Sequence, residues 1–242
     1  MPENKDKLLV IIPAYNESES ICKTVSQLMT VCTDIDYIVV DDGSTDTTSD
    51  ICIRERYPLL RLPVNLGLSG AFQAGVKYAK EKGYGYVLQF DADGQHLPQY
   101  IVNLWQRAKE GADVVIGSRY LQKNKEHSLR RFGGKLISAA IFVTTGKKIY
   151  DPTSGMRLYS SRLINGFSGI PNFDPEPDMI AYLIHRGYRV EEVAVTMEER
   201  VAGQSYLRLG RVVQYMLRML LSILLIHILI SQRQMLIYGS NL

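Results

Sequence analysis

The chain has 242 residues, of which 46% are hydrophobic and 22% are charged. This composition excludes a disordered chain and suits one α/β domain with a core and a short appendage. The net charge of +3 is unevenly spread, because residues 200–242 hold five arginines and no Asp or Glu. A basic, acid-free end favours an anionic partner, either a membrane surface or a nucleic acid.

The cysteines and the N-terminus point to a reducing compartment. Cys22, Cys32 and Cys52 are odd in number and form no CxxC pair, so neither a disulfide framework nor a zinc site is expected. Residues 1–7 are polar and lack the apolar segment of a signal peptide. These features predict a cytosolic location.

Short apolar runs alternate with helical patterns over the first 120 residues. Strands are expected at Leu8–Pro13, Tyr37–Val40, Leu59–Leu62, Tyr86–Phe90 and Val114–Ile116. Helices are expected at Glu17–Val31, Thr45–Arg56, Ser69–Lys82 and Pro98–Glu110. This alternation predicts an α/β fold of βαβ units with a mainly parallel, Rossmann-like sheet.

The pattern loosens after residue 120. Lys123–Arg131 is polar, basic and typical of a loop, Phe132–Gly146 fits a helix, and Gly187–Glu198 contains one more strand. We expect one main domain over residues 1–199, followed by a loop and a helical tail over residues 200–242.

The tail has the spacing of an amphipathic helix. Polar residues recur every three or four positions and form a stripe opposite an aliphatic side: Arg208, Arg211, Gln214 or Tyr215, Arg218 and Ser222. Met219–Ile230 carries no formal charge but is shorter than the roughly 20 residues that span a bilayer. The tail is therefore expected to lie in the membrane interface, or to form a helix hairpin there. The alternative is a helix packed on the protein's own core.

Acidic residues follow two of the expected strands. Asp91 and Asp93 come after Tyr86–Phe90, and Asp41 and Asp42 come after Tyr37–Val40. In parallel sheets, ligands bind beyond the carboxyl ends of the strands. Two such carboxylates can hold a hard cation, which in a sugar transfer would neutralise a departing diphosphate. The alternatives are a solvated turn at Asp91 and Asp93, and a helix cap after Asp42.

Pro13–Glu17 occupies the same place after the first strand. Tyr15 in this segment offers a ring on which a nucleobase can stack. Asp42 could accept hydrogen bonds from a base or a ribose.

Six motifs occur in order: IIPAYNE, VVDDGSTDTT, NLGLSGAFQAG, QFDADGQH, IGSR and DPTSGMR. Together they resemble family-2 glycosyltransferases of the GT-A fold. The chain is most similar in pattern to dolichyl-phosphate mannosyltransferases and to bacterial enzymes that load a sugar onto polyprenyl phosphate. The resemblance extends from about residue 8 to about residue 230.

The resemblance implies a role for each matching position. Mg²⁺ or Mn²⁺ and the diphosphate would be held by Asp91, Asp93 and Gln95. The nucleoside would be surrounded by Pro13, Tyr15, Glu17 and Asp42. The acceptor phosphate would meet Arg119, Arg131, Arg200 and Ser205. For Arg119, the alternative is a salt bridge to a neighbouring carboxylate.

The expected reaction is a direct displacement at the anomeric carbon, with inversion. A phosphate monoester has a second pKa of about 6, so the acceptor is already anionic at neutral pH and needs no base. Transfer to a hydroxyl would need one, and Glu176 or Asp178 could supply it. These two residues could instead hold sugar hydroxyls or cap the helix that begins near Asp178.

The sequence thus predicts an enzyme of cell-envelope glycan synthesis at the cytoplasmic face of the membrane. The expected donor is UDP-GlcNAc or UDP-glucose and the expected acceptor is undecaprenyl phosphate, because the tail resembles shorter family members with these substrates. A small membrane subunit or a homo-oligomer could assist its anchoring. The alternatives are transfer to a saccharide hydroxyl, nucleotide-sugar binding without turnover, and nucleic-acid binding. The last is disfavoured because the tail is aliphatic and contains no known reading motif.

Overall fold

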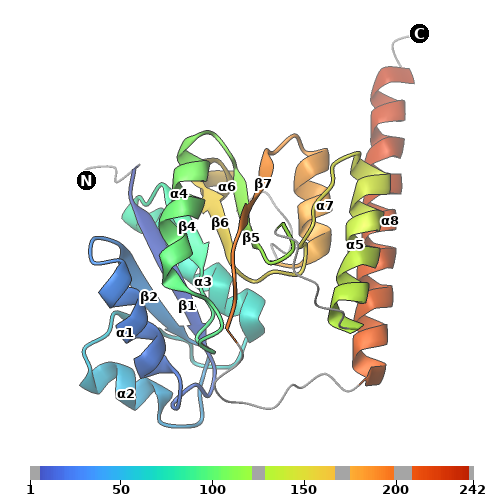
Figure 1. Cartoon of the computed structure of the whole chain (residues 1–242). Coiled ribbons are helices and arrows are strands. Elements are labelled where there is room, and N and C mark those ends of the chain that lie inside the picture. Colours follow the sequence, from blue (N-terminus) through green and yellow to red (C-terminus); the bar gives the residue numbers. More distant parts are fainter. Residues whose placement is uncertain (1–5, 122–128, 167–174, 199–208, 240–242) are drawn as a thin grey trace.

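One mixed sheet of seven strands organises the chain (Figure 1). The computed structural model describes residues 6–121, 129–166, 175–198 and 209–239. The strands are β1 Leu8–Ala14, β2 Asp36–Asp41, β3 Leu59–Arg61, β4 Tyr86–Gln89, β5 Val114–Ser118, β6 Arg157–Ser160 and β7 Val190–Ala194. Their order in the sheet is β3-β2-β1-β4-β6-β5-β7. All neighbours are parallel except β6, which runs antiparallel to both β4 and β5.

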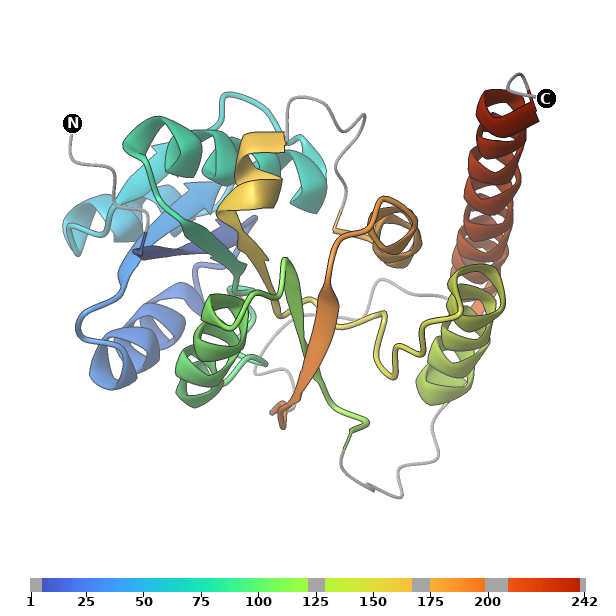
Figure 2. The ribbon, with the colours of Figure 1, turned by 90° about the horizontal axis from the view of Figure 1, so that it is seen from above.

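Helices cover both faces of this sheet (Figure 2). They are α1 Ile21–Val31, α2 Thr48–Arg54, α3 Gly67–Lys82, η1 Pro98–Tyr100, α4 Ile101–Lys109, α5 Leu129–Thr145, α6 Ser161–Gly166, α7 Pro177–His185 and α8 Leu209–Gly239. Alternate residues of β1 enter different cores: Leu9 and Ile11 pack with α3, whereas Val10 and Ile12 pack with α1 and α4. This period of two is what a strand buried on both faces requires. The predicted α/β architecture with a mainly parallel sheet is confirmed.

The first two predicted helices begin later than expected because the loops before them bind each other. The backbone N–H groups of Asn16 and Glu17 donate to the hydroxyls of Ser44 and Thr48, at 3.0 and 2.9 Å. In return, the Asn16 side-chain oxygen accepts the N–H of Thr45 at 2.8 Å. These bonds satisfy backbone N–H groups that have no intrahelical partner, and they hold the two segments together as loops. The loops after β1 and β2 are thereby fixed to each other.

The sequence pattern did not predict β6 or α6. β6 has only four residues and directly follows the DPTSG loop, so its apolar run carries no clear period. The predicted loop over Lys123–Arg131 is wrong at its end, because α5 already begins at Leu129. Residues 122–128 lie outside the described part of the chain.

The helices α5, α7 and α8 pack together at one end of the molecule (Figure 1). The polar stripe predicted for the tail is wrong in part. Tyr215 and Ser222 face α7, where Glu176 and Asp178 accept their hydroxyl hydrogen bonds, whereas Gln214 and Arg218 are exposed. The side chains of Arg208 and Arg211 lie outside the described residues. Because they bind carboxylates just before α7 and in its first turn, two hydroxyls of the stripe face the protein instead of solvent.

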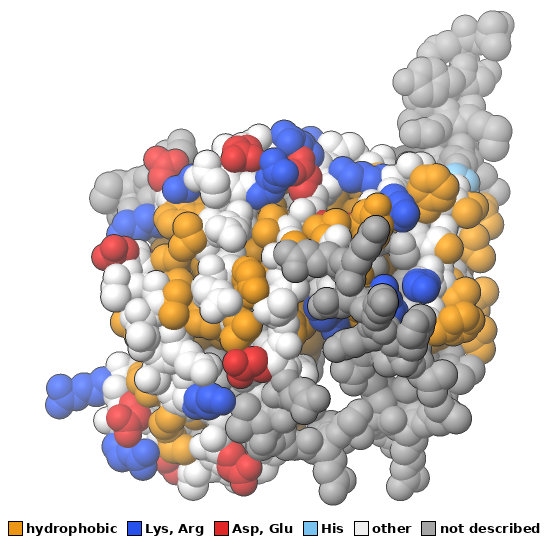
Figure 3. Space-filling model, viewed as in Figure 1, with side chains coloured by type: hydrophobic (Ala, Val, Ile, Leu, Met, Phe, Trp, Pro, Cys, Tyr) orange, Lys and Arg blue, Asp and Glu red, His pale blue; other side chains and the backbone are white. Residues whose placement is uncertain are grey.

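The outward side of α8 is largely apolar, and α5 extends this side (Figure 3). We call the following exposed residues the α5–α8 apolar surface: Phe132, Leu136, Phe142, Val143, Leu217, Leu221, Leu224, Leu225, Ile228 and Leu229. Among the residues that the structure describes, no helix combines the length and the apolar character that a bilayer crossing demands.

The packing of α3 on β1 gives a test of the core. A Cβ added to Gly75 would lie 2.5 Å from Cγ2 of Ile11, which is fully buried. We expect Gly75→Ala to lower the free energy of unfolding by about 1–3 kcal/mol through overpacking. Urea unfolding followed by circular dichroism measures this change.

Gly134→Ala is the matched control on α5. Its added Cβ would meet only the Thr153 hydroxyl, at 3.9 Å, so stability should stay level or rise by up to about 1 kcal/mol. Equal losses in both variants would contradict the assigned contact between α3 and β1.

Candidate active site

Three loops at the carboxyl ends of β1, β2 and β4 form one pocket of about 200 Å³. The parallel register places Ala14 beside Asp41, and Phe90 follows β4 on the other side of β1. The pocket brings together most of the residues predicted to bind the donor: Pro13, Tyr15, Glu17, Asp42, Asp91 and Asp93. Ala14, Leu68, Ala71 and Ala92 supply the apolar part of its lining.

The two acidic residues after β2 have different surroundings. Asp41 is buried and binds its own loop: its carboxylate accepts the Ser44 N–H at 3.0 Å and the Ser49 hydroxyl. Asp42 lines the pocket, and its Oδ1 accepts the N–H of Leu66 at 2.7 Å. Asp41 therefore shapes the loop, and Asp42 is the one available to a ligand.

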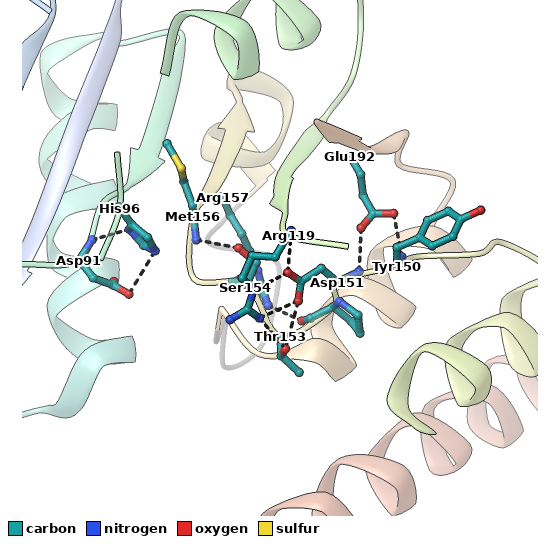
Figure 4. Close-up of polar contacts among 11 residues, drawn as sticks. Asp91, His96, Arg119, Tyr150, Asp151, Thr153, Ser154, Met156, Arg157 and Glu192 are labelled. Atoms are coloured by element: carbon teal, nitrogen blue, oxygen red, sulfur yellow. Dashed lines mark hydrogen bonds and ion pairs between the residues drawn. The ribbon is translucent and has the colours of Figure 1, made fainter. Parts of the chain in front are cut away.

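Asp91 is held by two neighbouring side chains. The Gln89 amide donates to its Oδ1 at 3.0 Å, and His96 Nε2 lies 3.7 Å from its Oδ2 (Figure 4). His96 Nδ1 accepts the backbone N–H of Asp91 at 2.9 Å, so the proton of the neutral ring is on Nε2, facing the carboxylate. His96 is almost fully buried, which leaves Asp91 little freedom to turn.

The pocket fits a divalent cation only together with a donor. No three His, Cys, Asp or Glu side chains form a ready-made cation site within the described ranges. Mg²⁺ is commonly held by one or two carboxylates plus substrate phosphates. Asp91 and Asp93 offer these carboxylates, and diphosphate oxygens can complete the shell. Gln95 contributes its backbone N–H, which donates to Asp93 Oδ1 at 3.0 Å.

The loop between α5 and β6 lies beside Asp91. A Cβ at Gly155 would be 2.7 Å from Asp91 Oδ2, so only glycine lets the loop approach this closely. Further along the loop, Asp151 is fully buried and binds Arg119 through both carboxylate oxygens, at 2.7 and 2.8 Å (Figure 4). The salt-bridge alternative for Arg119 is therefore present in the structure, and its contact with an acceptor stays a prediction.

Glu192 on β7 fixes the start of the same loop. Its two oxygens accept the N–H groups of Tyr150 and Asp151, both at 2.8 Å (Figure 4). Burial raises the pKa of the Glu192 carboxyl above its usual value, although these two bonds oppose the rise. The loop is thus anchored to the far strand of the sheet.

Arg157, at the start of β6, holds residues 152–154 of the loop by hydrogen bonds from the protein interior. Its side chain is only 2% exposed, and it donates to the carbonyls of Pro152 and Ser154 at 2.7 and 2.8 Å. It also reaches the Glu176 carbonyl at the start of α7, at 3.2 Å.

A second, larger pocket of about 590 Å³ lies on the other side of this loop. Its lining is basic and apolar: Tyr120, Arg131, Lys135, Ser138, Ala139, Phe142, Lys148 and Tyr150. The ring of Tyr120 lies close to both predicted arginines, since the guanidinium carbons of Arg119 and Arg131 are each 5.3 Å from its centroid. Arg131 thus lies where a phosphate could be bound, next to apolar groups.

The remaining predicted residues differ in outcome. Glu176 and Asp178 do not line the donor pocket, because their carboxylates accept hydrogen bonds from Tyr215 and Ser222 of α8. Glu176 occupies the N-cap position of α7, but its side chain makes no capping hydrogen bond there, so the capping alternative is wrong for this carboxylate. Arg200 and Ser205 lie outside the described residues.

Several residues of the site were not assigned from the sequence. His96 and Asp151 stand inside recognised motifs, which was the available signal. Lys135 and Lys148 occur in no motif, and only the packing of α5 against the loop at residues 147–150 brings them together.

Comparison with known proteins agrees with this geometry. The family model "Glycosyl transferase family 2" matches residues 9–167. A polyprenol monophosphomannose synthase of Mycolicibacterium smegmatis is 30% identical over 212 residues, covering 82% of this chain and 80% of that protein. An undecaprenyl-phosphate mannosyltransferase of Micrococcus luteus is 30% identical over 214 residues, covering 82% and 86%. A dolichol-phosphate mannosyltransferase of Pyrococcus furiosus is 33% identical, and the match covers 87% of this chain and 62% of that protein.

Solved structures share the fold. Glucosyl-3-phosphoglycerate synthase from Mycobacterium tuberculosis, in complex with Mn²⁺, UDP-glucose and phosphoglyceric acid, superposes with a TM-score of 0.67 at 19% identity. The match covers 91% of this chain and 79% of that one. The predicted resemblance and the GT-A-like architecture are both confirmed, and the chain belongs to glycosyl transferase family 2.

Proposed function

We propose that this enzyme transfers a sugar from a nucleotide sugar to a polyprenyl phosphate at the cytoplasmic face of the membrane. The observation that carries the proposal is the pairing of two pockets of opposite character across one short loop. The loop borders the acidic pocket at Gly155, and its Tyr150 lines the basic one. The names of relatives support this acceptor, since they refer to polyprenol and undecaprenyl phosphate.

The pocket at the ends of β1, β2 and β4, called the acidic or donor pocket here, suits the nucleotide sugar. Tyr15 is 44% exposed and can stack on a base, while Asp42 can accept hydrogen bonds from the nucleoside. Asp91 and Asp93 would hold Mg²⁺ or Mn²⁺, which would neutralise charge on the departing diphosphate. His96 and Gln89 keep Asp91 oriented for this task.

The basic pocket suits a phosphate that carries an isoprenoid chain. Arg131, Lys135 and Lys148 can bind the phosphate, and Ala139 and Phe142 offer apolar contact to the chain. A phosphate monoester is largely a dianion above pH of about 6, so its oxygen can attack the anomeric carbon without a protein base. The new bond joins that oxygen to the carbon, the carbon–diphosphate bond breaks, and the configuration inverts.

The rival acceptor, a saccharide hydroxyl, would need a base. Glu176 and Asp178 were the candidates, and both accept hydrogen bonds from α8. We therefore favour the phosphate. UDP-GlcNAc and UDP-glucose remain the proposed donors, and GDP-mannose is the competitor because three relatives are named for mannose.

The decisive assay incubates the enzyme and membranes with labelled UDP-GlcNAc, UDP-glucose or GDP-mannose, with and without undecaprenyl phosphate. We expect label in a lipid that mild acid hydrolyses, only when this acceptor and Mg²⁺ or Mn²⁺ are present. Asp91→Asn should lower turnover at least about 100-fold, because charge on the leaving group loses its support. Asp50→Asn, on the exposed side of α2, is the control. Label in soluble saccharide, or full activity in EDTA, would refute the proposal.

The role proposed for the basic pocket, binding of the acceptor phosphate, can be tested by charge reversal. Lys135→Glu and Lys148→Glu should each raise the KM for polyprenyl phosphate about tenfold or more, since a repulsive charge replaces an attractive one. The KM for the nucleotide sugar should change little. Lys23→Glu, an exposed residue of α1 outside both pockets, is the matched charge reversal. The assignment of this pocket fails if all three variants keep the acceptor KM of the wild type.

The α5–α8 apolar surface is the proposed contact with the bilayer. The helices α5 and α8 contain no Asp or Glu. The exposed cations Lys135, Lys148 and Arg218 lie on or near these two helices. Such a combination favours an anionic membrane surface. A small membrane subunit or a second copy of the chain could share this surface.

Leu221→Asp tests this contact. Leu221 is 60% exposed on α8, so the change should keep the fold and reduce co-sedimentation with phosphatidylglycerol vesicles several-fold. Ile53→Asp is the control, because Ile53 is 58% exposed on α2. Unchanged vesicle binding by Leu221→Asp would exclude this surface as the membrane contact.

A further inference from the structure

Two hydroxyl groups on the inner side of α8 bind carboxylates of α7. Tyr215 donates to Glu176 Oε2 and Ser222 donates to Asp178 Oδ2, each at 2.5 Å. The donors are two turns apart on one side of α8, so both bonds can form together. Burial, and then the charge of Glu176, raise the pKa of Tyr215, so its hydroxyl stays protonated and keeps donating.

The two bonds lead to different parts of the molecule. Asp178 uses its other oxygen to accept the N–H of Met179, within α7 itself. Glu176 instead precedes the first turn of α7, and its carbonyl accepts a hydrogen bond from Arg157 at 3.2 Å. One residue therefore contacts α8 through its side chain and Arg157 through its backbone.

Arg157 connects the start of α7 to the loop beside Asp91 through its hydrogen bonds. The guanidinium is buried and binds the carbonyls of Pro152 and Ser154, so it cannot move without losing hydrogen bonds in a dry environment. Gly155 follows Ser154 and leaves no room for a Cβ against Asp91 Oδ2. A shift of the loop toward the pocket would therefore displace the carboxylate.

We propose that Tyr215 is a positioning residue, which fixes the start of α7 and thereby Arg157, the loop at residues 152–155 and the carboxylate of Asp91. The inference rests on the proposed function, because it assumes that Asp91 helps to hold a divalent cation. It assigns to α8, the helix that carries the apolar surface, a second task of keeping the donor pocket in order.

The test compares Tyr215→Phe with Ser222→Ala in the full chain. Each variant removes one hydroxyl that α8 donates to a carboxylate at the start of α7. Tyr215 binds Glu176, whose carbonyl accepts from Arg157, whereas Ser222 binds Asp178. We expect Tyr215→Phe to weaken the binding of Mn²⁺ in the presence of UDP about tenfold, measured without turnover by the electron paramagnetic resonance signal of free Mn²⁺. The Mn²⁺ concentration for half-maximal transfer should rise by a similar factor, a size typical of lost support around a metal ligand. Ser222→Ala should leave this concentration at the wild-type value. The acceptor KM, vesicle binding and Tm should be similar in the two variants.

Glu176→Ala provides an independent arm if Tyr215→Phe folds poorly. It should raise the Mn²⁺ requirement by a similar factor, and the double variant should raise it no further, because both changes break one path. A wild-type protein with no metal-dependent transfer would refute the proposed function itself. If the wild type is active, two results would overturn only the role of Tyr215. One is an equal rise of the Mn²⁺ requirement in Tyr215→Phe and Ser222→Ala, and the other is an additive rise in the double variant.

Discussion

The buried guanidinium of Arg157 is the interaction on which the arrangement of the site depends. A cation removed from water must keep its hydrogen bonds, and here they go to carbonyls of the loop and of the start of α7. Another loop conformation would leave these donors unsatisfied at a cost of several kcal/mol. The loop that separates the two pockets is therefore set by the core beneath it, which is unusual for a surface connection.

The separation matters because the two proposed substrates carry similar charge. A nucleotide diphosphate and a lipid phosphate repel each other, so each needs its own counter-charge. The donor pocket has carboxylates, which suit a donor that arrives with a cation, and the second pocket has Arg131, Lys135 and Lys148. The pair Asp151–Arg119 lies between them and is neutral as a unit.

The sequence predicted best the features that depend on local order along the chain. Asp42, Asp91 and Asp93 follow apolar runs, and parallel strands bring such positions to one edge, so their meeting could be expected. The hydrogen-bond partners of Glu176 and Asp178 could not be predicted. Tyr215 and Ser222 come about 40 residues later, on a helix whose rotation about its axis is set by packing. Spacing alone placed these hydroxyls on the same side of the helix as the arginines. β6 was missed because its four residues carry no clear period, and its antiparallel course comes only from its pairing with β4 and β5.

The tail shows why amphipathic spacing does not by itself tell which side of a helix faces the protein. In α8, Met219 and Ile223 are buried beside the two inward hydroxyls, while leucines cover the outer side. A helix bound to its domain only by apolar contacts could rotate and bury these leucines instead. The two hydrogen bonds to α7 oppose that rotation, because turning α8 would leave two carboxylates without these donors. The polar groups that fix the helix thus keep its apolar side exposed, as the proposed contact with a bilayer requires.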